Sequence, residues 1–171
     1  MTLRPSEKMQ DFVDYIITQC QNDKGFAAKI KRADNPNTEY YSWDILVRFI
    51  DLTKDYERLP YAYIAAAIAD GKVLKNGDLG IGRVLSKCYD TANTVGNQEE
   101  PAKIKLRRLL ACQNTTEICA ALRPIFSLIR AKGFAANLDY VRLLANLCWF
   151  NEQTKRDWAM DFYRNQESIY E

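Results

Sequence analysis

The chain has 171 residues, of which 47% are apolar and 27% are charged, and its formal net charge is +2. This composition is typical of a folded globular protein with one sizeable core, and it excludes general disorder. No apolar run approaches the roughly 18 residues that a membrane-spanning helix needs, and the first residues lack the pattern of a secretion signal. We therefore expect a cytoplasmic protein without a membrane partner.

The chain contains no histidine and five cysteines. The absence of histidine excludes Ser–His and Cys–His catalysis, together with every zinc site that needs an imidazole. The cysteines never occur as C-x-x-C and mostly stand among apolar residues, which predicts reduced thiols in the core. These residues are Cys20, Cys88, Cys112, Cys119 and Cys148.

Apolar residues recur at helical spacing from the start of the chain. Residues 9–20 predict a first helix, with Ser6 placed to begin it and Gly25 placed to stop it. A short helix is expected over about 26–33. A segment over about 38–53 follows, and its apolar residues fall on one side: Tyr40, Trp43, Leu46, Val47 and Ile50.

The next helix is predicted to begin at Pro60, since proline suits a first helical position, and to end at Gly71. Another helix is expected from Asp78 to about residue 90. The polar stretch over about 91–100 predicts a connection between an N-terminal lobe, about 1–90, and a C-terminal lobe, about 101–171, of one domain.

In the second half, Pro101 predicts the start of a helix. Asn114 followed three residues later by Glu117 predicts the start of another, in which Pro124 should produce a kink. Two further helices follow, "LDYVRLLANLCWF" and "TKRDWAMDFYRN". No alternating pattern predicts a strand. We expect an all-α fold: a compact bundle of about eight or nine helices, with the possibility of two small lobes.

The stretch "GDLGIGRVLSK", residues 77–87, carries three glycines before two cations. It lacks the Lys-Ser/Thr pair and the preceding strand of a phosphate-binding loop, so it does not predict a nucleotide site. We expect Gly80 and Gly82 to let two helices approach closely, and Asp78 to cap the helix. Arg83 and Lys87 then share one helical face, where an anion would relieve their repulsion.

The small net charge hides a strong segregation of charges. Residues 24–33 hold four cations and no acid, and residues 103–136 hold seven cations against Glu117 alone. Residues 34–70 hold seven acids against three cations. This distribution predicts one surface for phosphates and a less basic surface for protein neighbours, although a run of charges is also typical of an ordinary solvated face.

The helix over about 101–113 illustrates both interpretations. If Ile104, Leu109 and Cys112 face the core, the cations project from the remaining arc: Lys103, Lys105, Arg107 and Arg108. Most large aromatic residues follow the apolar stripes and are expected in the core, namely Trp43, Trp149, Trp158 and Phe162. The placement of Tyr40, Tyr41, Tyr61 and Tyr63 is left open.

Several stretches together resemble the CasB family, the small subunits of the type I-E CRISPR surveillance complex called Cascade. They are, in order, "FAAKIKRADNP", "LGIGRVLSK", "KIKLRRLLAC" with "LRPIFSLIRAKG", "LDYVRLLANLCWF" and "KRDWAMDFY". The resemblance implies an all-helical, non-enzymatic subunit present in two copies. It also implies contacts with other Cascade subunits, with the guide RNA paired to target DNA, and with the displaced DNA strand, through phosphates rather than base edges.

The family motifs and the basic segments around them select twelve residues for phosphate binding. They are Lys29, Lys31, Arg32, Arg83, Lys87, Lys103, Lys105, Arg107, Arg108, Arg123, Arg130 and Arg142. No cofactor or metal is implied. Two alternatives stay open: a helical adaptor or regulator whose basic face meets an acidic protein, and an enzyme with a metal site at Asp157 and Asp161, one turn apart on the last helix.

Overall fold

The computed structural model describes residues 6–89 and 99–167. Within these ranges the chain forms nine α-helices and two short 3-10 helices, and the only strand-like feature there is a parallel bridge between Leu79 and Leu138, so the predicted all-α fold is confirmed. None of the helices searched in these ranges is long and apolar enough to cross a membrane. The elements are α1 (Glu7–Asn22), α2 (Lys24–Ile30), η1 (Glu39–Ser42), α3 (Trp43–Leu46), α4 (Asp55–Asp70), α5 (Ile81–Lys87), α6 (Glu99–Leu110), α7 (Thr115–Ala131), η2 (Ala135–Asn137), α8 (Tyr140–Cys148) and α9 (Glu152–Glu167).

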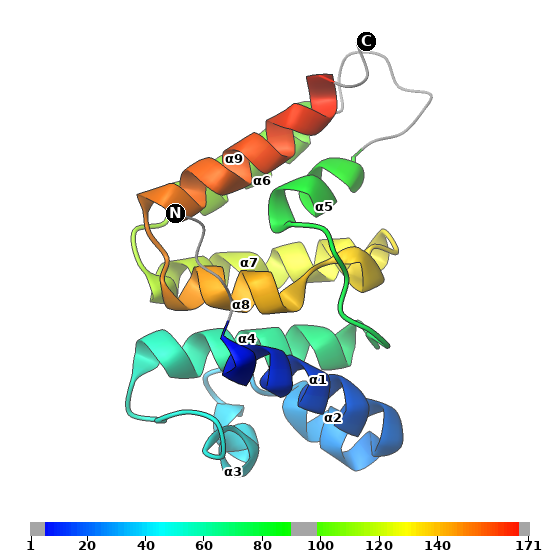
Figure 1. The fold of residues 1–171 in the computed structure, drawn as a ribbon, viewed down its shortest axis with the longest axis vertical. Helices are drawn as coiled ribbons and strands as arrows, with labels where there is room; N and C mark the ends of the chain where they lie inside the picture. The colour runs from blue at the N-terminus through cyan, green and yellow to red at the C-terminus, as the bar shows by residue number, and fades with distance from the viewer. Residues whose placement is uncertain (1–5, 90–98, 168–171) are drawn as a thin grey trace.

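The helices are stacked in layers along the long axis of the molecule (Figure 1). α1, α2 and α3 lie at one end, α4 and then α7 and α8 occupy the middle, and α5, α6 and α9 form the other end. α4 contacts α1 and α2 on one side and α7 and α8 on the other. Small buried side chains allow this central position, because they let neighbouring helices approach from several directions: Ala62, Ala65, Ala66 and Ala69.

Two helix starts are confirmed by hydrogen bonds from backbone N–H groups to side chains. The Met9 N–H donates to Ser6 Oγ at 3.3 Å at the start of α1. At the start of α7, the Glu117 N–H donates to Asn114 Oδ1 at 2.9 Å, and the Gln113 N–H donates to Glu117 Oε2 at 2.7 Å. Both caps satisfy N–H groups that have no partner within their own helix.

Two predicted helix boundaries are wrong. α4 begins at Asp55 rather than at Pro60, so the proline lies inside the helix, and acidic residues in the first turn favour this earlier start. Gly25 lies inside α2 and does not stop α1. The stop comes at Asp23, whose carboxylate accepts the Gly25 and Phe26 N–H groups and so begins α2 at once.

The outcome for the large aromatic residues is mixed. Trp158 and Phe162 are buried as predicted, whereas Trp43 and Trp149 are exposed, so their assignment to the core is wrong. The apolar side predicted over 38–53 is also wrong, because α3 buries Ile45 and Leu46 and the regular helix ends there, so Tyr40, Trp43 and Val47 are exposed although Ile50 is buried. Trp149 follows the last residue of α8, where the chain no longer keeps the helical phase of the buried stripe. Tyr61 and Tyr63 are buried, whereas Tyr40 and Tyr41 are exposed.

α7 is one helix that continues through Pro124, and the kink there stays a prediction. Most of the proposed connection over 91–100 lies outside the described residues. α5 packs most extensively against α9 and also contacts α6 and α7. α5, which precedes the proposed connection, therefore packs against helices of the predicted C-terminal lobe. We propose on this basis that the chain is one domain.

Candidate nucleic-acid interface

Two glycines bring α5 against α9. A Cβ atom at Gly82 would overlap the carbonyl oxygen of Trp158, and one at Gly80 would overlap a carboxylate oxygen of Asp161. The close helix approach predicted for these glycines is therefore confirmed, and a residue with a side chain at Gly82 would push the two helices apart.

The predicted cap at Asp78 is wrong. Gly80 is the N-cap of α5, and it has no side chain that could accept a hydrogen bond from the first turn. The acceptor comes from α9, because Asp161 Oδ2 accepts the Arg83 N–H at 2.9 Å. Asp161 thus has a structural role, and Asp157 accepts a hydrogen bond from Gln153 Nε2 at 2.8 Å. Within the described residues, no group of three or more His, Cys, Asp or Glu side chains is arranged to hold a metal ion.

α6 has one face in the core and one face outside. Ala102, Leu106 and Leu109 are buried, at the spacing of one helical stripe. Ile104 is 45% exposed, so its prediction as a core residue is wrong, because Leu106 rather than Ile104 lies at the centre of the stripe. Cys112, just after the helix, is buried as predicted.

The cations of this helix form what we call the α6 cation group: Lys103, Lys105, Arg107 and Arg108. Arg107 and Arg108 are exposed, and Lys103 and Lys105 are half-buried. Lys103 and Arg107 already take part in interactions of their own. Arg108 forms no ion pair within the described part of the chain, so its guanidinium is the member most available to an anion.

Three of the predicted phosphate-binding residues form ion pairs with carboxylates. Lys29 pairs with Asp44, Arg130 pairs with Asp70, and Arg123 Nε lies 3.2 Å from Asp34 Oδ2. All three acids come from the acid-rich segment over 34–70. Charges that are separated along the chain are therefore brought together by folding, and a phosphate would have to compete with these carboxylates.

The basic turn, which we define as Lys31 and Arg32, directly follows α2. Both residues are exposed, and Arg32 lies over the ring of Tyr41 with 5.3 Å between the guanidinium carbon and the ring centroid. The ion pair between Asp34 and Arg123 joins this part of the chain to α7. The basic turn belongs to the α1–α3 end of the molecule, whereas α6 belongs to the other end (Figure 1).

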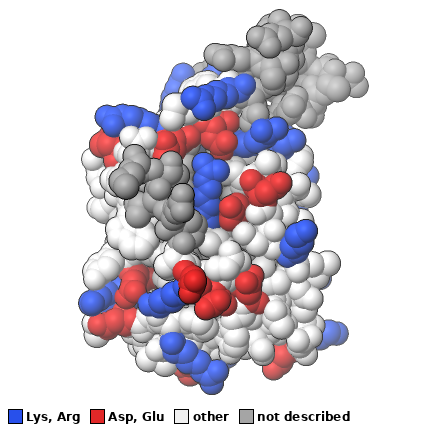
Figure 2. All heavy atoms as spheres, in the orientation of Figure 1, with Lys and Arg blue, Asp and Glu red and all other residues white. Residues whose placement is uncertain are grey.

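The remaining predicted residues lie on α5 and α8. Arg83 is exposed and Lys87 is half-buried. Arg142 is also half-buried, and it lines a small pocket together with Gly80 and Trp158. On the face in Figure 2, Lys and Arg side chains lie among Asp and Glu side chains rather than in one continuous basic patch.

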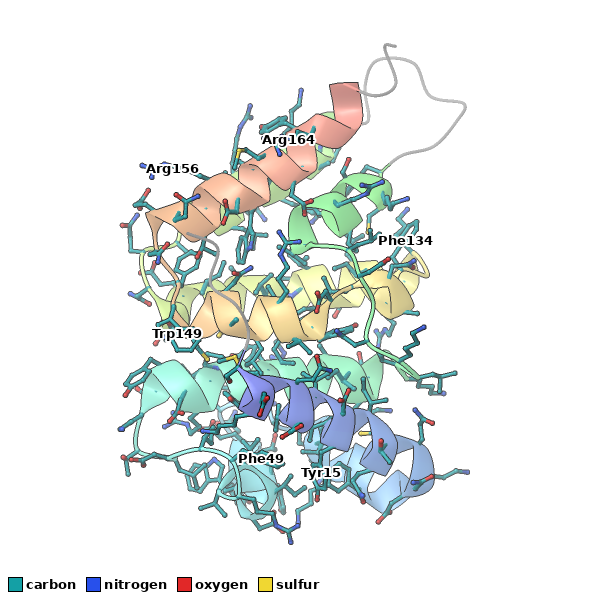
Figure 3. The ribbon with its side chains drawn as sticks, viewed as in Figure 1. Tyr15, Phe49, Phe134, Trp149, Arg156 and Arg164 are labelled. Atoms are coloured by element: carbon teal, nitrogen blue, oxygen red, sulfur yellow. The ribbon has the colours of Figure 1, made fainter. Side chains whose placement is uncertain are left out.

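The sequence prediction included no cation of α9. Arg156 and Arg164 are both exposed and project from the outer side of this helix (Figure 3). The sequence could have indicated both residues, because Arg156 lies within the closing motif "KRDWAMDFY" and Arg164 directly follows it. Arg164 Nη2 also lies 3.6 Å from the sulfur of Met160.

All five cysteines are free; Cys88, Cys112 and Cys119 are buried as predicted, and Cys20 and Cys148 are half-buried. Burial raises the pKa of the Cys20 and Cys88 thiols to about 11 and that of Cys148 to about 12. Because the thiolate is the reactive form, these groups are poor nucleophiles near neutral pH.

Comparison with known proteins places this fold. No curated protein matches the chain. Among solved structures, the crystal structure of CasB from Thermus thermophilus matches with a TM-score of 0.63 and 20% sequence identity, and the match covers 91% of this chain and 97% of that chain. This likeness shows a shared fold. A family model described as CRISPR-associated protein Cse2 matches residues 27–163, a span that includes the basic turn, the glycines of α5 and the α6 cation group. Since this match covers most of the chain, the protein belongs to the Cse2 family of CRISPR-associated proteins, which confirms the resemblance to the CasB small subunits of Cascade.

Proposed function

We propose that this small Cascade subunit binds the phosphate backbones of the guide RNA–target DNA duplex and of the displaced DNA strand, and that it catalyses no reaction. The observation that carries this proposal is the two-sided character of α6. Leu106 and Leu109 anchor the helix in the core, and Arg107 and Arg108 are exposed on the outside.

Such an arrangement suits a partner that is recognised by charge alone. Base pairing with the guide supplies sequence specificity, so the protein needs cations at phosphate spacing rather than groups that read base edges. A helix fixed in the core holds its arginines at defined positions. Arginine also suits phosphate because its planar guanidinium can donate two hydrogen bonds at once.

The other predicted residues support the proposal to different degrees. Arg83, with Lys87 one turn later on α5, would add a second short line of cations. Phosphate binding would gain less from the three cations that must first exchange a carboxylate for a phosphate, namely Lys29, Arg123 and Arg130. Arg142 would contribute least from its half-buried position beside Gly80.

Family membership supports assembly with other Cascade subunits. Within that assembly we propose guide RNA and target DNA as partners, a second copy of this chain beside the first, and the cytoplasm as the location. The proposed lack of catalysis is supported by the absence of histidine and by the raised thiol pKa values.

The test is a charge reversal on α6. Arg107→Glu together with Arg108→Glu should lower the affinity of the assembled complex for target DNA and make binding less dependent on salt, since each lost phosphate contact reduces the slope of log K against log salt by about 0.9. The circular-dichroism spectrum should stay helical. Lys72→Glu with Lys75→Glu is the matched control, because both lysines are exposed and lie outside the predicted set.

Unchanged affinity and an unchanged salt slope in the α6 variant would contradict the proposal. Binding to an acidic polypeptide, but not to DNA, would favour the protein-binding adaptor. Purification of the tagged protein from cells at mild salt provides a second measurement. Recovery of short RNAs with a common repeat-derived end, and of other proteins in fixed ratio, is the expected result.

A further inference from the structure

Exposed aromatic side chains gather on one side of the segment over 40–47. Tyr40, Trp43 and Val47 follow helical spacing and are all exposed, with Tyr40 at 54%. Tyr41 is also exposed, and its ring stacks on that of Tyr40 with 4.4 Å between the centroids and 27° between the planes. The buried residues of α3 are Ile45 and Leu46, so packing of the core does not account for these rings.

A cation without a carboxylate partner lies beside the rings. Arg32 lies over the Tyr41 ring, and within the described residues it belongs to no ion pair. The neighbouring acids are already engaged. Asp44 pairs with Lys29, Asp34 pairs with Arg123, and Glu39 Oε2 lies 3.5 Å from Arg58 Nε. The surface at the rings therefore keeps its positive charge.

Hydrogen bonds hold the rings and cations in place relative to one another. Thr38 Oγ1 donates to the Arg32 carbonyl oxygen at 2.9 Å, which ties the start of η1 to the basic turn. Ser42, which is fully buried, donates from Oγ to the Glu39 carbonyl oxygen at 2.7 Å. The rings are thus presented by a fixed backbone, and little freedom is lost when a ligand binds.

We infer that Tyr40 and Trp43 form a stacking surface for the unpaired bases of single-stranded DNA, with the Tyr41 ring packed behind that of Tyr40, and that Arg32 binds its phosphates. Aromatic rings beside unpaired cations are the combination that binds single strands without sequence preference. This inference rests on the proposed function, in which the guide RNA and the target strand are paired and only the displaced DNA strand has free bases. It adds a role for aromatic residues that the proposed function does not include.

The test compares two DNA strands that share their phosphates and differ in their bases. The full chain is titrated with a thymidine oligonucleotide and with an abasic strand of equal length. The variant Tyr40→Leu with Trp43→Leu keeps apolar surface but removes the two stacking rings, and it leaves Tyr41 in place. We expect it to bind the thymidine strand about tenfold more weakly or worse, and the abasic strand as the wild type does.

Tyr56→Leu is the matched control, because Tyr56 is 53% exposed and stands between Asp55 and Glu57 rather than beside cations. It should leave both affinities unchanged. Quenching of tryptophan fluorescence by the thymidine strand, lost in Trp43→Leu, is a second expected result.

Two results with the wild type would overturn the inference: equal binding of both strands, or binding of neither. Two results with the ring variant would also overturn it: unchanged thymidine binding, or an equal loss for both strands, which would indicate a protein-docking or folding role. In each case the Arg107→Glu and Arg108→Glu measurement on the assembled complex decides the proposed function separately.

Discussion

Gly82 sets the distance between α5 and α9. A hydrogen atom in place of a side chain lets the Trp158 carbonyl oxygen lie against the α5 backbone. At the same contact, Asp161 accepts the Arg83 N–H, so one turn of α9 both packs against α5 and caps it. A single methyl group would disturb both interactions, because the atom that it meets belongs to the backbone of a helix and cannot rotate away.

Gly82→Ala should therefore lower the free energy of unfolding by about 1–3 kcal/mol. Urea unfolding followed by circular dichroism measures the change. Gly25→Ala is the control, since its Cβ would meet only the Asp23 carboxylate at 3.2 Å, a side chain that can shift. A Gly82→Ala protein as stable as the control would show that α5 is free to move away from α9.

The thiols provide a second prediction for single residues. Because burial raises the pKa of Cys20 to about 11, its thiol stays protonated until the pH approaches that value. Its contribution to stability is present below the pKa of the unfolded chain and is lost as the pH rises through about 11. Near neutral pH, alkylation of Cys20 should be roughly a hundredfold slower in the folded chain than in the urea-unfolded chain. Equal rates would show that the thiol is neither buried nor perturbed.

At the scale of one element, α6 divides its residues between the core and the solvent. Leu106 is 1% exposed, and Ile104, two positions earlier, is 45% exposed. The basic character of the helix is compatible with folding only because the buried stripe is narrow and the cations lie beside or opposite it. The α6 cation group depends on this orientation.

Leu106→Ala should destabilise the protein by about 2–5 kcal/mol, because it leaves a cavity in the core. Ile104→Ala should change stability by less than about 0.5 kcal/mol, since that side chain is already largely in water. Thermal unfolding of the two variants measures the difference. Equal effects would mean that α6 is rotated from the orientation described above.

At the scale of the whole molecule, ion pairs and packing join segments that are far apart in the chain. Arg123 of α7 reaches Asp34, and Arg130 reaches Asp70 at the end of α4. These pairs are partly exposed, so their main effect is on the distribution of charge rather than on stability. Packing of α4 against five other helices, and of α5 against α9, provides the stronger connection between the layers.

We therefore predict a single cooperative unfolding transition. In a variant with Trp43→Phe and Trp149→Phe, the fluorescence of the buried Trp158 reports on α9, and far-UV circular dichroism reports on all helices. The two urea transitions should coincide. Separate midpoints would instead favour two lobes that unfold independently.

The sequence alone predicts the helical class, the caps at Ser6 and Asn114, and the close helix contact at Gly80 and Gly82. These features depend on residues a few positions apart, whose spacing and hydrogen-bonding groups are visible along the chain. It also carried the ordered motifs of the Cse2 family. The folded structure was needed to show which side of α6 is buried and that Trp43 and Trp149 are exposed. It also decided that Asp161 caps α5 and that distant acids pair with Lys29, Arg123 and Arg130. The reason is that a helical repeat permits several buried stripes, and the partner that selects among them comes from a distant part of the chain.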